Sequence, residues 1–291
     1  MKALHIAMIM MSALLATACL SEHEDIFDVP LDGHTFFEAD FEDVGFPGNS
    51  DRLWERNVGI GVFGSVEGMN EKYTLKKAFD SKRTGEFYGP KVSGEKVKAY
   101  YPYSEDFSLL DGNLSYTLAP HQEFDGTTSM YDQFCRYSKV VYAFCYGNGK
   151  LKFCHASGLL SVQTRLDVSK IVKSISISSD QPLAGIGYVA DDMSVTMAGS
   201  ASRTIMLDCG DGVVSKNGDV YSKFPVVMPA GVYENLRVVL TFDNDEVIES
   251  EYDSIEVERV TAYDCQVREI IVSNGLGGFE VEGDLEFEPR L

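Results

Sequence analysis

Apolar and polar residues alternate over many short stretches of this chain, and turn-forming pairs such as Asp111-Gly112 and Asn217-Gly218 separate them. Alternation with a period of two is typical of β-strands that bury one face. Helical periodicity is nearly absent, and we expect one helical turn over residues 130–138. The pattern predicts an all-β protein with a β-sandwich architecture. The predicted strands are residues 35–42, 58–63, 96–101, 139–146, 150–154, 159–168, 172–178, 184–190, 203–208, 224–228, 235–242, 255–260 and 280–287.

The first eighteen residues have a different character. Lys2 precedes an almost wholly apolar stretch, residues 3–18, which is short for a membrane span and ends in small side chains. The ending Leu15-Ala16-Thr17-Ala18-Cys19 resembles a bacterial lipobox, in which the cysteine is lipidated and becomes the first residue. We expect cleavage before Cys19 and anchoring to the outer membrane through lipid on that cysteine. The alternative is an ordinary secretory signal cut near Ala18.

An acidic segment follows Cys19. Such a run resembles the surface-export signal of Bacteroidetes lipoproteins and predicts a location outside the outer membrane; the alternative is a simple flexible linker. The composition changes again at Gly147-Asn148-Gly149, from an aromatic-rich half to one that alternates Val, Ile and Leu with polar residues. The predicted organisation is a signal peptide (1–18), an acidic tether (19–33), an N-terminal β-sandwich domain (34–147) and a C-terminal β-sandwich domain (148–291).

The charge of the chain limits its partners. There are 45 acidic and 25 basic residues, which gives a formal net charge of −20. Nucleic-acid binding requires Lys and Arg side chains that displace counterions from the phosphate backbone. We therefore expect no nucleic-acid partner, and we interpret the acidity as a source of solubility at a crowded cell surface.

The sequence offers little catalytic chemistry. It contains no nucleophile elbow, no zinc-protease helix motif and no phosphate-binding loop. Cys154 and His155 are adjacent, so on one strand their side chains would point to opposite faces and could not form a dyad. Acidic clusters such as Asp191-Asp192 lack the spacing of a calcium-binding EF-hand and are interpreted as turn residues. We expect a protein that is not an enzyme and binds no cofactor or metal.

Cysteine and tryptophan usage favour structural roles. Six cysteines less Cys19 leave an odd number, so they cannot all pair internally, and small buried thiols with at most one disulfide are expected. Trp54, the only tryptophan, precedes a predicted strand and is expected to anchor the core.

Several motifs together resemble the fimbrillin-like family of Bacteroidetes surface proteins, the Mfa-like and FimA-like lipoproteins. The resemblance spans nearly the whole mature chain. It rests on the lipoprotein start and on these blocks: a Phe-rich strand (34–42), Arg52 in a loop, W-x6-GVF (Trp54 to Phe63), N-x-x-Y (Asn70 to Tyr73), Phe79, AYYPYS (Ala99 to Ser104), L-x-F-x-H-x-x-G-x-L (Leu151 to Leu160), V-x-S-I-x-I (Val172 to Ile177) and PAG-x-Y-x-NL (Pro229 to Leu236).

The family implies two transthyretin-like β-sandwich domains in tandem and assembly by donor-strand exchange. An arginine-specific protease would cut in the loop after the first strand and release residues 34–42, and another subunit would then supply a replacement strand. In this chain the cut would follow Arg52, with Arg56 as the second choice. The candidate donor strand is the segment 279–287, whose apolar positions are Phe279, Val281, Leu285 and Phe287.

The resemblance therefore predicts a fimbrial (pilus) subunit or adhesin whose partners are other fimbrial subunits, with a host or glycan ligand as a further expectation. The chain is shorter than the main polymerising fimbrillins, which favours an accessory, tip or anchor role over the main shaft. The alternative function is a non-polymerising outer-membrane lipoprotein that binds glycans, in which Trp54, Tyr100, Tyr101 or Tyr103 would stack on sugar rings. The segment 279–287 could equally be an ordinary last strand of its own domain.

Overall fold

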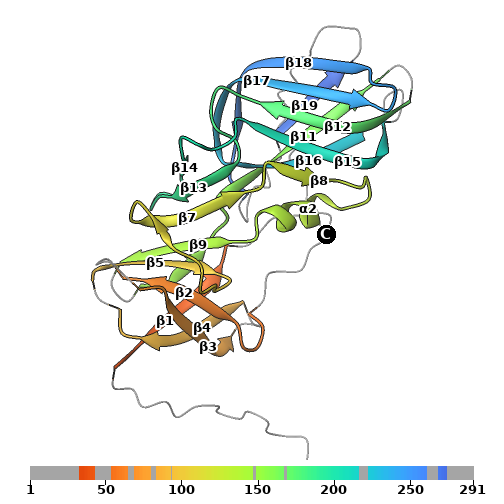
Figure 1. Cartoon of the computed structure of the whole chain (residues 1–291). Helices are drawn as coiled ribbons and strands as arrows, with labels where there is room; N and C mark the ends of the chain where they lie inside the picture. The colour runs from red at the N-terminus through yellow and green to blue at the C-terminus, as the bar shows by residue number, and fades with distance from the viewer. Residues whose placement is uncertain are drawn as a thin grey trace, which may run out of the picture. The chain divides into compact units, whose positions relative to one another are not determined.

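The computed structural model describes nine segments of the chain. Nearly all of their regular structure is β, as the alternating pattern predicts, and Figure 1 shows the strands in chain order. The predicted helical turn is confirmed as α2 (Met130–Tyr137), which Ser129 caps by accepting a hydrogen bond from the Asp132 backbone N–H. No helix among these residues is long and apolar enough to cross a membrane. The described segments are 33–42, 54–64, 69–79, 83–92, 94–146, 149–166, 169–215, 222–260 and 268–273.

Seven strands from the first half of the chain, between residues 34 and 153, form one sheet. Its strand order is β10-β1-β4-β3-β2-β5-β9. The backbones of Tyr142 and Cys154 exchange two hydrogen bonds of 2.9 Å, which bridges β9 to the residue after β10. The sheet therefore closes on itself. The strands are β1 (His34–Phe41), β2 (Gly59–Phe63), β3 (Glu71–Phe79), β4 (Thr84–Pro90), β5 (Lys96–Tyr101), β9 (Val141–Tyr146) and β10 (Leu151–Phe153).

Alternation along these strands divides the apolar residues between two cores. In β5, Ala99 lies in the core enclosed by the seven-stranded sheet, whereas Tyr100 lies in the second core outside it. Val62 and Phe63 of β2 divide in the same way. Since successive side chains point to opposite faces of a strand, one sequence pattern serves both cores.

A four-stranded sheet, in the order β14-β13-β7-β6, lies against the second core with Leu114, Tyr116 and Leu118 of its strand β7. It pairs β7 from the first half of the chain with β13 from the second half. Its strands are β6 (Leu109–Leu110), β7 (Asn113–Leu118), β13 (Gly185–Val189) and β14 (Val195–Met197).

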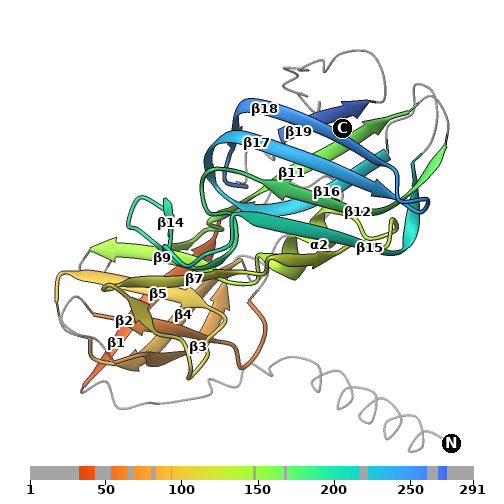
Figure 2. The same cartoon turned by 45° about the horizontal axis from the view of Figure 1, so that its top comes forward.

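Two further sheets enclose the remainder of the second core, and Figure 2 shows their strands, β8 excepted, in green to blue. Val162 and Val226 come from the three-stranded sheet, and Ile175 and Val238 come from the five-stranded sheet. The first has the order β16-β11-β19 and the second β18-β17-β12-β15-β8. Their strands are β8 (His121–Glu123), β11 (Ser157–Arg165), β12 (Lys170–Ser178), β15 (Thr204–Ser215), β16 (Ser222–Pro229), β17 (Gly231–Phe242), β18 (Val247–Val257) and β19 (Arg268–Ser273).

Strand pairing crosses the predicted boundary between residues 147 and 148. The strand β10 pairs with β1, β13 with β7, and β15 with β8. Apart from the first 32 residues, the chain forms one compact unit, Gly33–Leu291. The division into two tandem domains stays a prediction.

Most predicted strands are confirmed with shifted ends. The exception is 255–260, which covers only the end of β18 (Val247–Val257). The strands that were not predicted are β3, β4, β6, β7, β8, β14 and β19. The predicted strand 280–287 lies outside the described residues.

Candidate functional site

The strand β1 lies between two neighbours, so it is an interior strand of the closed sheet. Residues His34 to Asp40 pair antiparallel with β4, and Ala39 to Phe41 pair parallel with β10. Just beyond the strand, the Glu42 backbone N–H donates to the carbonyl of Phe153 at 2.7 Å. We call the position between β4 and β10 that β1 fills the β1 slot. A chain without β1 would expose two strand edges here.

The inner face of β1 supplies part of the enclosed core. Phe37 is 2% exposed and Ala39 is fully buried, and Phe41 packs against the same core. The ring of Phe37 contacts Tyr73 of β3 at a centroid distance of 5.5 Å. Full burial of a phenylalanine side chain stabilises a fold by about 1.5–3 kcal/mol. The core of this sheet therefore depends on β1.

Trp54, which lies outside the strands of the sheet, contacts β1. Its indole Nε1 donates to the carbonyl of Ala39 at 3.1 Å, and its ring stacks on Phe41 with centroids 4.0 Å apart. It also meets the rings of Phe87 and Phe153 edge-on. At 1% exposure it is a core anchor, as the sequence predicts.

The middle of the slot has little room. Ala39 pairs directly with Gly85 of β4. A Cβ atom on Gly85 would lie 2.9 Å from Cδ1 of Trp54 and 2.8 Å from Cδ1 of Leu75, closer than Cβ atoms approach such groups. The indole thus fills the space over this pair of residues. A strand in the slot needs a small side chain where Ala39 stands.

Acidic residues occupy every second position on the outer face of β1, and they pair with Lys150, just before β10, and Lys152 of β10. Lys150 Nζ lies 2.8 Å from Glu38 Oε1 and 3.1 Å from Asp40 Oδ2. Its hydrogen bonds to these two carboxylates raise the pKa of Lys150. Lys152 Nζ lies 3.7 Å from Glu42 Oε1. Exposed pairs of this kind contribute little each, about 0–1 kcal/mol, but together they match one strand to another by charge.

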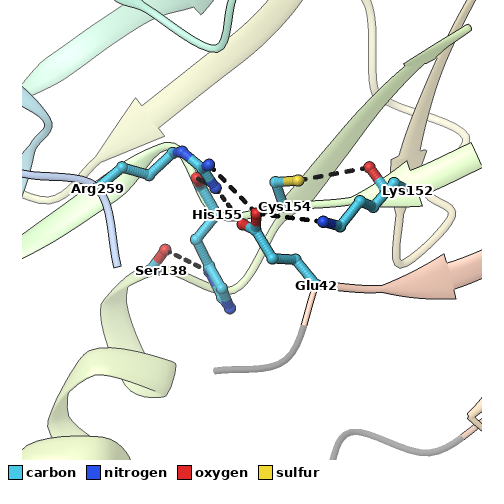
Figure 3. Close-up of polar contacts among 6 residues, drawn as sticks. All are labelled: Glu42, Ser138, Lys152, Cys154, His155 and Arg259. Atoms are coloured by element: carbon cyan, nitrogen blue, oxygen red, sulfur yellow. Dashed lines mark hydrogen bonds and ion pairs between the residues drawn. The ribbon is translucent and has the colours of Figure 1, made fainter. Parts of the chain in front are cut away.

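The third acid, Glu42, is held more tightly. Its side chain is 12% exposed, and Arg259, which follows β18, donates Nη1 to Oε2 and Nη2 to Oε1 at 3.3 Å. Arg259 Nη1 also donates to the carbonyl of His155 at 3.4 Å. Figure 3 shows Arg259 and Lys152 converging on the Glu42 carboxylate. This arrangement ties the end of β1 to a residue more than two hundred positions away in sequence.

Cys154 and His155 lie beside this ion pair without forming a catalytic dyad. The Ser138 hydroxyl and His155 Nδ1 are 2.9 Å apart, and the Cys154 thiol donates to the Lys152 carbonyl at 3.5 Å (Figure 3). Burial, together with the nearby carboxylate of Glu42, raises the pKa of the Cys154 thiol to about 12. A thiol of this pKa is a poor nucleophile. Cys145, Cys154 and Cys209 are buried free thiols.

The four aromatic residues predicted to stack on a ligand are partly or fully buried. Trp54 and Tyr100 are buried, and Tyr101 and Tyr103 are half-buried against the two cores. The acidic cluster at Asp192 forms a turn, because its carboxylate accepts hydrogen bonds from the backbone N–H and the hydroxyl of Ser194. No group of three or more metal-binding side chains occurs among the described residues.

Other predicted site residues lie outside the described part of the chain: Cys19, Arg52, Phe279, Val281, Leu285 and Phe287. The second-choice cut site, Arg56, is described and exposed, in a turn with Asn57 at a φ of 63°. Lys150, Lys152 and Arg259 were not predicted as site residues from the sequence. The alternation of Lys150 and Lys152 with apolar residues was a visible signal for the first two.

No protein-family model matches the sequence, and no curated protein matches it either. Solved structures with a similar fold include a putative cell adhesion protein from Bacteroides ovatus, with 13% identity over 82% of this chain and 91% of that chain and a TM-score of 0.49. A putative cell adhesion protein from Bacteroides uniformis has 18% identity over 86% and 96% and a TM-score of 0.41. The fimbrial anchor protein Mfa2 from Porphyromonas gingivalis has 9% identity over 82% and 89% and a TM-score of 0.40.

Proposed function

We propose that this chain is a cell-surface fimbrial subunit or adhesin, made as a lipoprotein precursor and assembled by donor-strand exchange at β1. The observation that carries the proposal is the place of β1 in the sheet. It lies between β4 and β10, fills the core with Phe37 and Ala39, and precedes the candidate cut site Arg52. Its removal would leave a groove with two free strand edges, which is the acceptor that strand addition requires.

The position of Trp54 favours Arg52 over Arg56 as the cut site. Trp54 packs on Phe87 of β4 and Phe153 of β10, so it contacts the strands that would remain after cleavage as well as β1. Cleavage after Arg52 leaves the indole in place to receive a new strand. Cleavage after Arg56 would remove it and open a cavity of tryptophan size in the core, which costs about 3–5 kcal/mol.

The same geometry makes the precursor stable before cleavage. The strand β1 is held by two ladders, the Trp54 hydrogen bond and the ion pair between Glu42 and Arg259. A subunit of this kind stays monomeric until a protease acts. Lipid on Cys19 anchors the precursor to the outer membrane, and the role that we propose is accessory, tip or anchor.

Site-specific loss of cleavage tests the proposal. The expected result is that Arg52→Ala remains a full-length monomer at the cell surface, while the wild-type chain enters high-molecular-weight assemblies. The matched control is Arg56→Ala, which should assemble like the wild type. Assembly of Arg52→Ala at the wild-type level, with β1 still attached, would contradict strand exchange.

Glycan binding receives no comparable support. Of the aromatic residues considered for sugar stacking, Trp54 and Tyr100 are 1% and 0% exposed. Sugar stacking requires an accessible ring face. The surface-subunit function therefore stands as the one that the geometry favours.

A further inference from the structure

The β1 slot selects its strand by two independent features, one of size and one of charge. The size feature is the small residue that Trp54 and Gly85 require at the position of Ala39. The charge feature is the row of cations formed by Lys150, Lys152 and Arg259 along the outer face. A matching strand therefore has a small residue in the middle and acids at alternate positions around it.

The chain contains this pattern a second time, near its C-terminus. Residues 37–42 are Phe-Glu-Ala-Asp-Phe-Glu, and residues 281–286 are Val-Glu-Gly-Asp-Leu-Glu. Apolar, acidic, small, Asp, apolar and Glu positions follow in the same order in both segments. Gly283 corresponds to Ala39, and Glu286 corresponds to Glu42.

We infer that the β1 slot accepts residues 281–286 of a second copy of this chain in this one register, fixed by Gly283 at the Ala39 position and by an ion pair between Glu286 and Arg259. The inference rests on the proposed function, because β1 must leave before another strand can enter. It adds to that function the identity of the partner and the residues that set specificity.

Charge alone does not choose the register. A shift by two residues keeps every side chain on its face, since strands have a period of two. Segments 279–284 and 283–288 also place acids at all three outer positions. The cationic row therefore attracts all three registers.

Size decides between the three registers. Segment 279–284 would place Val281 at the Ala39 position and Gly283 at the Phe41 position, against the Trp54 ring. Segment 283–288 would place Leu285 at the Ala39 position, opposite Gly85, where even one added Cβ atom would clash with the indole. Only the register 281–286 combines a small residue over Gly85 with an apolar side chain beneath Trp54.

In each register a different acidic residue would form the ion pair with Arg259. The partner is Glu286 in the inferred register, Asp284 in the register 279–284 and Glu288 in the register 283–288. Arg259 has a side chain that is only 24% exposed, so loss of its carboxylate partner is costly. The identity of this partner is therefore measurable by charge reversal.

The experiment uses the full chain with the pair reversed, Glu42→Lys with Arg259→Glu, so that the uncut protein keeps an ion pair at this place. The protein is treated with an arginine-specific endopeptidase, which does not cut at the new lysine. Intact mass gives the extent of cleavage, and light scattering gives the fraction in assemblies. Assembly of the reversed variant should fall about tenfold or more below wild type, because Glu286 would meet a carboxylate.

Addition of Glu286→Lys to the reversed variant should restore assembly to within about twofold of wild type. Matched controls add Asp284→Lys or Glu288→Lys instead and should not restore it. Rescue by either control, or equal assembly of all variants, would overturn the inferred register. Absence of assembly by the cleaved wild-type chain would count against the proposed function itself, so the two failures are distinguishable.

Discussion

Trp54 and Ala39 are joined by a hydrogen bond of 3.1 Å from the indole Nε1 to the backbone carbonyl, and this bond connects the body of the sheet to the strand that we propose is exchanged. The donor is a side chain and the acceptor is main chain. Any strand that replaces β1 in the same register would present a carbonyl at the same place. The contact therefore holds the first strand without depending on its side chain at that position.

The substitution Trp54→Phe should lower the free energy of unfolding by about 1–3 kcal/mol, because it removes the buried hydrogen bond to the Ala39 carbonyl. Chemical denaturation followed by circular dichroism measures the change. Tyr146→Ala, at a residue that is 71% exposed, is the control and should change stability by less than about 0.5 kcal/mol. Equal stability of Trp54→Phe and wild type would show that the indole does not hold β1.

Glu42 and Arg259 should be energetically coupled. A double-mutant cycle with Glu42→Ala and Arg259→Ala should give a coupling of about 1.5–3 kcal/mol, since the carboxylate is 12% exposed and doubly hydrogen-bonded. The matched cycle on the exposed pair Arg237 and Glu249 should give a smaller coupling. A coupling at Glu42 no larger than that of the exposed pair would contradict the role assigned to this contact.

Cys154 should report the departure of β1. Burial and the Glu42 carboxylate raise the pKa of its thiol to about 12, so at about pH 8 only about one thiol in ten thousand is ionised. Alkylation followed by peptide mass spectrometry should find Cys154 unmodified in the intact chain and modified once β1 is lost. Cys209, in the second core with a pKa of about 12, is the internal control and should stay unmodified in both forms. Modification of Cys154 in the intact chain would indicate that the slot opens without cleavage.

Alkaline pH should destabilise the closed sheet. Burial raises the pKa of Tyr73 to about 12, above its ordinary value of 10.0, so its neutral form is the one that the fold prefers. The contribution of neutral Tyr73 to the free energy of unfolding is fully present below about pH 10. It is lost as the pH rises from there towards about 12, because Tyr73 loses its hydroxyl proton at a lower pH in the unfolded chain than in the folded one. Denaturation curves between about pH 8 and about pH 11 should show this loss, and Tyr73→Phe should reduce the slope. If Tyr73→Phe leaves the slope of the free energy of unfolding against pH unchanged, Tyr73 is not a source of the alkaline destabilisation.

Local pattern was enough to predict much of the fold. The alternation in residues 35–42 and 96–101 predicts β1 and β5, and both are present with one-residue shifts at most. The strands β3 and β4 were missed because the segments Glu71–Phe79 and Thr84–Pro90 contain lysines or glycines, which have low strand propensity. Pairing with β1 and β2 stabilises them instead, and no local signal reports such pairing.

The candidate site was only partly predictable for the same reason. Its acids on β1 and the core role of Trp54 follow from local pattern, whereas Arg259 meets Glu42 through a contact that spans 217 positions. The room around Ala39 depends on Gly85 and Leu75 from two other strands. Such features arise from the register between distant segments, which a period-two pattern leaves open.

The most direct test of strand exchange is the N-terminus of the protein recovered from the cell surface, measured by mass spectrometry. Strand exchange after cleavage at Arg52 predicts a chain that begins at Leu53, from which β1 has been removed and in which Trp54 is retained. A chain that begins only at acylated Cys19 would contradict it, because β1 would then still occupy its slot.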